Sequence, residues 1–201
     1  SNKKWLTKEQ IDNEDENINR NGVGFHIPKM FDKVIDIDKC YLQNDFSNNI
    51  RNHIRDFAFD KKLTFFDIRE QNGLLRNLIV RTSSNGEIMI IVCFHEEEEI
   101  QYELLEDVKN NFPEITSLMY VNNTKKNDNI SDLEIRTHSG KDHIYEEMEG
   151  LKFKIGPKSF YQTNSKQAYE LYKFTRDYAN LNGDEIVFDL YTGTGTIANF
   201  V

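Results

Sequence analysis

Two β-rich runs joined by a tight turn place the strongest restriction on how this chain can fold. The runs are LLRNLIVRT, which ends at Thr82, and EIMIIVCF, which ends at Phe94, and Asn85-Gly86 lies between them. Asn-Gly favours a two-residue hairpin turn because both residues tolerate a positive φ. The sequence therefore predicts an antiparallel hairpin here.

A helix and a further strand follow this hairpin. EEEEIQYELLEDVKNNF carries apolar residues at helical spacing, and Pro113 comes directly after it as a stop. The apolar residues are Ile100, Leu104, Leu105, Val108 and Phe112. SLMYVNN then has the composition of a strand. Together these elements predict a central α+β domain with antiparallel sheets and packed helices.

The segments before this block are predicted by the same rules. VGFHI and KVIDI have the pattern of short strands. Helical spacing predicts a helix from Asp45, taken as its N-cap, to about Asp60. Its apolar positions are Ile50, Ile54, Phe57 and Ala58. Residues 1–22 are mostly polar, and we expect a loop or frayed segment there.

The last third of the chain ends on a helix and a strand. Hairpins are expected around Ser139-Gly140 and Glu149-Gly150. A helix then begins after Asn164 or Ser165 as cap and ends at Asn182-Gly183. Its predicted apolar face is Ala168, Leu171, Tyr172 and Ala179. The strand EIVFDLY comes next, and a helix followed by a strand is how a Rossmann-like domain begins.

This pattern predicts three parts. Residues 1–22 form the polar segment, residues 23–163 form the central α+β domain, and residues 164–201 form the start of a Rossmann-like domain. We place the boundary near Thr163.

Composition limits the functional classes. The net charge of −9 argues against a general nucleic-acid binder, which usually carries a basic patch. Two cysteines are too few for a disulfide scaffold, so a reducing, cytoplasmic location is expected. No run approaches the roughly 20 apolar residues of a membrane span. The run Glu96–Glu99 suits the first turn of a helix better than an acidic site.

A glycine-rich turn follows the final strand. Gly193-x-Gly195-x-x-Ala198 fits the loose fingerprint of a cofactor turn, in which backbone N–H groups approach the ligand. Asp189, at the end of the strand, would repel a pyrophosphate but suits the cationic groups of S-adenosylmethionine. The turn favours a methyltransferase. Which kind of α/β methyltransferase stays open, and so does a non-catalytic binding module in which the glycine turn is incidental.

Longer motifs carry a resemblance to a known family. IGPKSFYQTNSKQAYELY and GDEIVFDLYTGTGTI resemble the S-adenosylmethionine-dependent RNA uracil-C5 methyltransferases, which act on 23S ribosomal RNA or on the T-loop of transfer RNA. VGFHIPKMFDKVIDIDKCYLQ is similar to an upstream segment of that family. The resemblance covers most of the chain in the right order, and 23S ribosomal RNA is the expected substrate.

The resemblance assigns binding of the methyl donor to residues at matching positions. Gln162 matches the glutamine that contacts the donor, and Tyr191 matches an aromatic residue that stacks near it. Asp189 is expected to orient the turn. The full set is Gln162, Asp189, Tyr191, Gly193, Gly195 and Thr196. Thr192 stands where many relatives have a cysteine, a departure of small consequence because that cysteine is not the nucleophile.

The resemblance also bears on a metal. Cys40 matches the last of four cysteines that hold an iron–sulphur cluster in some family members. A cluster needs four ligands, and this chain has two cysteines, so it cannot be built from these residues alone. The resemblance implies Cys40 as a ligand in the intact protein only, and the alternative is a small apolar residue.

The chemistry of the family sets a further expectation. A cysteine thiolate adds to C6 of uracil, C5 then attacks the donor methyl group, and a carboxylate removes the C5 proton. The family's nucleophile and base lie after the glycine turn. We therefore expect residues 1–201 to be an inactive central fragment of such an enzyme, without catalytic residues of its own. We also expect self-association through the unpaired EIVFDLY strand.

Overall fold

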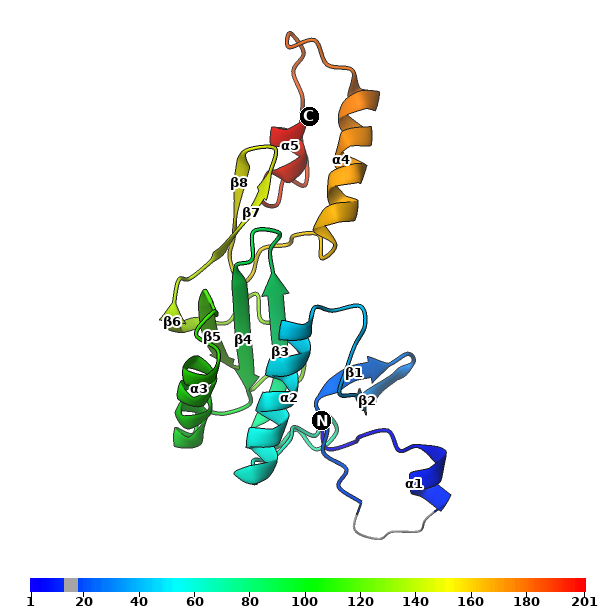
Figure 1. The fold of residues 1–201 in the computed structure, drawn as a ribbon, viewed down its shortest axis with the longest axis vertical. Helices are drawn as coiled ribbons and strands as arrows, with labels where there is room; N and C mark the ends of the chain where they lie inside the picture. The colour runs from blue at the N-terminus through cyan, green and yellow to red at the C-terminus, as the bar shows by residue number, and fades with distance from the viewer. Residues whose placement is uncertain (13–17) are drawn as a thin grey trace. The chain divides into compact units, whose positions relative to one another are not determined.

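The computed structural model describes residues 1–12 and 18–201 (Figure 1). The helices are α1 (Lys8–Asp12), α2 (Asp45–Asp60), α3 (Glu99–Asn111), α4 (Ser165–Ala179) and α5 (Thr196–Phe200). The strands are β1 (Gly24–Ile27), β2 (Met30–Asp36), β3 (Leu75–Thr82), β4 (Ile88–Phe94), β5 (Ser117–Asn122), β6 (Arg136–Gly140), β7 (Ile144–Met148) and β8 (Leu151–Ile155). Within these ranges no helix is long and apolar enough to cross a membrane.

Contacts divide the chain into two compact units. The first comprises residues 1–79, 92–113 and 120–136, and the second comprises residues 80–91, 114–119 and 137–201. The chain crosses between the units within β3, β4, β5 and β6. Thr163, where the sequence suggested a boundary, lies inside the second unit.

A four-stranded sheet has the order β3-β4-β5-β6. The predicted β3–β4 hairpin is confirmed: Gly86 has a φ of 86°, and the Ser83 N–H donates to the Glu87 carbonyl at 3.0 Å. The predicted antiparallel sheets are present in the β1–β2 and β7–β8 pairs, but the four-stranded sheet is mixed. Thr116 N–H donates to the Ile88 carbonyl, and Asn123 N–H donates to the Phe94 carbonyl, so β4 and β5 run in the same direction. Helix α3 provides the crossover that a parallel pair needs.

The hairpin predicted around Ser139-Gly140 is also wrong. These residues end β6, which pairs with β5, and the Lys141 N–H donates to the Thr116 carbonyl at 2.9 Å. Gly140 has a φ of 78°, and a Cβ there would lie 2.2 Å from the Thr116 carbonyl oxygen. The glycine is therefore required by close approach of two backbones.

Helices α2 and α3 lie side by side against the part of the sheet that belongs to the first unit (Figure 1). Helix α2 begins one residue after Asn44, whose side chain accepts from the Ser47 N–H at 2.8 Å, so the cap is not Asp45 as predicted. The apolar stripes are buried as expected, with Ile50, Ile54 and Ala58 on α2 and Leu104, Leu105 and Val108 on α3. Only Glu99 of the acidic run lies in the first turn of α3.

Residues 1–12 and 18–22 are more ordered than the predicted loop. Lys4 forms a parallel bridge with Val34 of β2, and the Trp5 N–H donates to the Val34 carbonyl at 2.8 Å. The Gly22 N–H donates to the Ser1 carbonyl at 2.9 Å. These polar residues are thus held by backbone pairing that composition does not reveal. Residues 13–17 of the predicted loop lie outside the described residues.

In the second unit, α4 and α5 pack beside the β7–β8 hairpin (Figure 1). Their shared apolar cluster comprises Met148, Phe153, Ala168, Tyr172 and Phe200. Two details of the predicted helix are wrong. Leu171 and Ala179 are exposed, and α4 ends at Asn180, which takes a left-handed conformation with a φ of 46°. The cap therefore comes before the predicted Asn182-Gly183.

The predicted strand EIVFDLY is not a strand in the structure. Ile186, Phe188 and Leu190 are each more than 80% exposed, at 84%, 81% and 84%. Within the described ranges no strand pairs with this segment. An extended segment gains ladder hydrogen bonds only from a neighbouring strand, so apolar composition alone does not make it one.

The contrast between two isoleucines gives a stability prediction. Ile91 of β4 has no exposed surface, whereas Ile186 is 84% exposed. Ile91→Ala should lower the free energy of unfolding by about 2–5 kcal/mol, because it removes buried methyl groups and leaves a cavity. Ile186→Ala, the same deletion at an exposed site, should change it by less than about 0.5 kcal/mol. Urea unfolding of residues 1–201 measures both, and equal losses would contradict the assignment of the core.

Candidate cofactor site

Residues 156–165 form the loop that leads into α4 and includes its first residue, Ser165, and this loop carries the predicted donor ligand Gln162. A turn opens it: the Ser159 N–H donates to the Gly156 carbonyl, and the Gly156 N–H donates to Ser159 Oγ, both at 3.1 Å. Asn164 closes it by accepting from the Gln167 N–H at 3.1 Å, as an N-cap does. The loop is thus defined at both ends by local hydrogen bonds.

Arg81, at the end of β3, reaches this loop. Its Nη1 donates to the Ser159 carbonyl at 2.7 Å and to the Gly156 carbonyl at 3.4 Å. Burial lowers the pKa of Arg81 from its usual value. An arginine remains charged under such conditions, so these are charge-assisted contacts to backbone oxygens.

Glu146, on β7, reaches the other end of the loop. It is 1% exposed, and its Oε2 accepts from Ser165 Oγ at 2.7 Å. Its Oε1 accepts from the Ser84 N–H at 3.0 Å and from the Ser84 hydroxyl. A buried carboxyl group needs such donors, because an unpaired one would lose its hydration without compensation.

Gln162 itself is exposed. Among the residues the structure describes, no hydrogen bond occupies its side-chain amide. The neighbouring Tyr161 behaves differently: its hydroxyl is buried without a hydrogen-bond partner. Desolvation, and then the nearby Glu146, raise the pKa of Tyr161. The loop therefore fixes Tyr161 inward and presents the Gln162 amide to solvent.

The predicted glycine turn is present although the strand before it is absent. Gly193 and Gly195 have φ values of 54° and 75°, which favour glycine. The Gly195 N–H donates to the Thr192 carbonyl at 2.7 Å. Asp189 Oδ1 accepts from the Tyr191 N–H at 3.2 Å, so Asp189 orders the backbone that enters the turn.

The side chains of the turn differ in their exposure to solvent. Tyr191 is 97% exposed, whereas Thr196 is 6% exposed and its hydroxyl lies 2.7 Å from that of Thr194. Helix α5 anchors the turn through Phe200, which stacks edge-on against Tyr169 with ring centroids 5.8 Å apart. Tyr161 packs on the same apolar cluster. The loop and the turn thus pack on the same apolar cluster. Within the described ranges, no hydrogen bond joins Gln162 to the turn.

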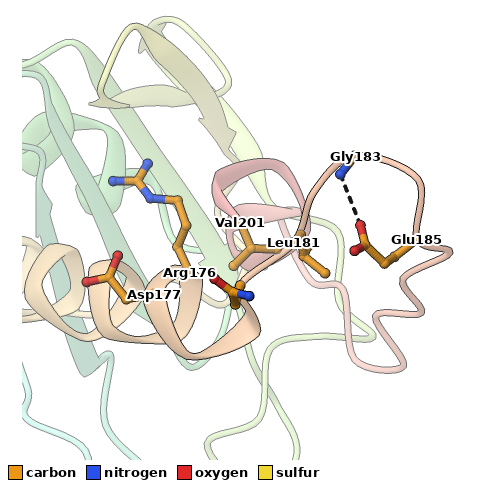
Figure 2. Close-up of a pocket in the computed structure, with 7 residues that line it drawn as sticks. Arg176, Asp177, Leu181, Gly183, Glu185 and Val201 are labelled. Carbon is orange, nitrogen blue, oxygen red and sulfur yellow. Dashed lines mark hydrogen bonds between the residues drawn. The ribbon is translucent and has the colours of Figure 1, made fainter.

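A surface depression of about 560 Å³ lies at the C-terminal end of α4. Figure 2 shows Arg176 and Asp177 on α4, and Glu185 accepting from the Gly183 N–H at 3.0 Å. None of the six predicted donor residues lines it. Its charged groups are already engaged: Arg176 donates to Glu149 at 2.8 Å, and the backbone N–H of Asn182 lowers the pKa of Glu185.

Comparisons with known proteins show which proteins this chain resembles. No family model matches the chain. A protein of Bacteroides thetaiotaomicron named as an uncharacterized RNA methyltransferase is 56% identical over 205 residues, which cover 100% of this chain and 45% of that protein. A Porphyromonas gingivalis protein of the same name is 54% identical over 207 residues, covering 100% of this chain and 44% of that protein.

A solved structure also resembles this chain in fold. It is the tRNA (uracil-54, C5)-methyltransferase of Pyrococcus abyssi in complex with S-adenosyl-L-homocysteine. The TM-score is 0.71 at 28% identity, over 89% of this chain and 43% of that chain. This chain is therefore similar to RNA methyltransferases along its whole length and to a tRNA uracil-C5 methyltransferase in fold. It spans less than half the length of the two curated relatives.

The residues described do not by themselves form a metal site. They contain no group of three or more histidine, cysteine or acidic side chains that could hold a metal ion. Cys40 is half-buried, and its backbone N–H and carbonyl pair with the Asn48 side chain at 2.8 and 3.1 Å. Cys93 is buried in β4, where desolvation raises its thiol pKa to about 12.

Arg81 and Glu146, which hold the loop that carries Gln162, were missed at the sequence level. A signal existed for Glu146, since it alternates with Ile144 and Met148 along β7 and all three are buried. A charged residue on the apolar side of a strand needs a partner. Arg81 gave no such signal, because its acceptors lie 75 and 78 residues away along the chain.

The two cysteines give a test of this geometry. The raised pKa of Cys93, about 12, leaves almost no thiolate at pH 8, and its side chain is inaccessible. A thiol reagent at pH 8 should therefore label native protein at Cys40 and reach Cys93 only after denaturation. In Cys40→Ser protein the native label should fall close to zero, counted by mass spectrometry. Rapid native labelling of Cys93 would contradict its position in the core.

Proposed function

We propose that the intact protein containing this chain transfers a methyl group from S-adenosylmethionine to C5 of a uracil in RNA. The observation that carries the proposal is the likeness to a tRNA uracil-C5 methyltransferase that holds S-adenosyl-L-homocysteine. S-adenosylmethionine becomes that molecule when it gives up its methyl group. The relatives' names support RNA methylation at a coarser level.

In this proposal Gln162 and the glycine turn hold the donor. The Gln162 amide is exposed and free to donate and accept. Gly193 and Gly195 leave the backbone open to a ligand: a Cβ at Gly193 would meet no atom within 3 Å, and one at Gly195 would meet only Asn199 Nδ2, at 2.8 Å. Tyr191 offers an exposed ring for stacking, Asp189 orders the turn, and Thr196 closes it.

The methyl transfer needs a thiolate nucleophile and a carboxylate base. Cys93 is unsuited, since its pKa of about 12 and its burial keep it a thiol. Cys40 lies on the loop before α2, in the first unit, away from the turn in sequence. We infer that the reacting groups come from a part of the protein outside residues 1–201. This chain alone would then be inactive and bind the donor weakly.

We propose 23S ribosomal RNA as the substrate and a cytoplasmic location. Two free cysteines agree with a reducing compartment. The solved relative is a tRNA methyltransferase, so transfer RNA is the alternative. With a net charge of −9, this chain would leave most phosphate contacts to other parts of the protein.

Donor binding by Gln162 is testable in the intact protein. Gln162→Ala should weaken S-adenosylmethionine binding about 10- to 100-fold, the effect of losing one or two hydrogen bonds to a ligand. Gln167→Ala is a matched control, because this exposed residue uses only its backbone N–H in the helix cap. Calorimetry gives both dissociation constants, and unchanged affinity in Gln162→Ala would remove Gln162 from the donor site.

The substrate is tested in the same preparation. Labelled donor is offered with 23S ribosomal RNA or with transfer RNA, and 5-methyluridine is detected by mass spectrometry. Methylation of transfer RNA alone would overturn the ribosomal proposal but keep the enzyme class. Micromolar donor binding by residues 1–201 alone would contradict the inference that this chain binds the donor weakly.

We also propose that residues 1–201 self-associate through residues 185–191. This segment exposes Ile186, Phe188 and Leu190, and exposed apolar chain favours association. Phe188→Lys should shift light scattering of the purified chain toward monomer. Leu42→Lys is the control, since Leu42 is 96% exposed but lies in the first unit. A clean monomer of the unsubstituted chain at about 100 µM would refute the proposal.

A further inference from the structure

The loop of residues 156–165 is held at both ends by charged side chains from outside it. Arg81 binds the start of the loop through the carbonyls of Gly156 and Ser159. Glu146 binds the end through the hydroxyl of Ser165, the first residue of α4. Gln162 lies between these two attachments. All of these residues belong to the second unit.

The two attachments converge on one stretch of backbone. Arg81 is near the end of β3, and Ser84, in the turn that follows, donates its N–H and its hydroxyl to Glu146. The tip of the β3–β4 hairpin therefore connects to both ends of the loop, once directly and once through the Glu146 carboxylate. A movement of either end of the loop would break a charge-assisted hydrogen bond.

Glu146 is a buried carboxyl group with hydrogen-bond partners that are distant in sequence. It is 1% exposed and lies on the buried side of β7 between Ile144 and Met148, which are 1% and 6% exposed. An apolar residue would satisfy packing at this position just as well. The carboxylate instead accepts from Ser84 and Ser165, which are 62 and 19 residues away in sequence. Its contacts therefore fix where α4 begins relative to the hairpin.

Tyr161 transmits this constraint to its neighbour. Its hydroxyl is buried near Glu146, and its ring packs on the apolar cluster of the second unit. Tyr161 is held inward, and the amide of the adjacent Gln162 is exposed. The orientation of Gln162 thus depends on the two attachments and on no hydrogen bond of its own among the described residues.

We propose that Arg81 and Glu146 are positioning residues for the methyl donor: together they hold the 156–165 loop so that Gln162 meets S-adenosylmethionine in a preorganised orientation. This inference rests on the proposed function. Neither side chain needs to touch the donor. Loss of either attachment leaves the Gln162 amide chemically intact. The loop then has more conformational freedom, which donor binding must remove.

The test uses the intact protein with Arg81→Ala and Glu146→Gln. Each should raise the dissociation constant and the KM for S-adenosylmethionine about 10-fold, while kcat at saturating donor and the KM for RNA change less than about 2-fold. The controls are Arg136→Ala and Glu147→Gln, an exposed arginine of β6 and the exposed glutamate beside Glu146. Both controls should retain wild-type donor affinity.

Hydrogen exchange separates positioning from general loss of structure. In Arg81→Ala and Glu146→Gln, amides of residues 156–165 should exchange at least 10-fold faster, while those of the buried β4 strand stay protected. Arg81→Lys should recover part of the donor affinity, since a lysine can still donate to one of the two carbonyls. If Glu146→Gln fails to fold, Arg81→Ala and Arg81→Lys carry the test alone.

The outcomes also separate this inference from the proposed function. If unsubstituted protein does not bind S-adenosylmethionine, the proposed function fails. If unsubstituted protein binds it and Gln162→Ala weakens binding, but Arg81→Ala and Glu146→Gln do not, the positioning role is overturned and the proposed function stands. Faster exchange throughout β4 in both variants would also overturn it, because the residues would then support the whole fold.

Discussion

Strand β4 is buried along its whole length, and the rest of the fold is arranged to keep it so. All seven residues from Ile88 to Phe94 are at most 8% exposed, which requires cover on both faces and pairing on both edges. β3 and β5 supply the edges. Burying such side chains contributes about 1.5–3 kcal/mol each, so few other arrangements of these strands could compete. The parallel β4–β5 pair follows, because α3 must return the chain to the same end of the sheet.

The sequence predicted those elements that depend on neighbours in the chain. Asn85-Gly86 identified the hairpin, and the spacing of Leu104, Leu105 and Val108 identified α3, because turn chemistry and helical periodicity are local. The direction of β5 was missed, since both directions give the same pattern of burial. β6 was missed for a different reason. Gly140 has the composition of a turn residue, but it is required by the close approach of its backbone to that of Thr116, which is distant in sequence.

In the candidate site, too, the features that depend on local sequence were predicted and those that depend on distant partners were not. The glycine turn was found from spacing, because a positive φ at Gly193 and Gly195 is a property of those residues. The contacts of Arg81 and Glu146 depend on partners 19 to 78 residues away, and although the alternation along β7 marks Glu146 as needing a partner, no local pattern identifies that partner. Gln162 and the other donor residues stay predictions, because their role depends on a ligand rather than on contacts within the chain.

Residues 185–191 and β4 show why apolar composition alone does not define a strand. Both are rich in β-branched and aromatic residues, but β4 lies between two partners, whereas Ile186 and Phe188 face solvent. The glycine turn that follows is nonetheless formed, because Phe200 anchors α5 to the cluster that also holds Tyr161. The turn therefore depends on packing behind it rather than on the segment before it. Since the glycine turn and the Gln162 loop both pack on the same apolar cluster, that cluster fixes where each lies relative to the other.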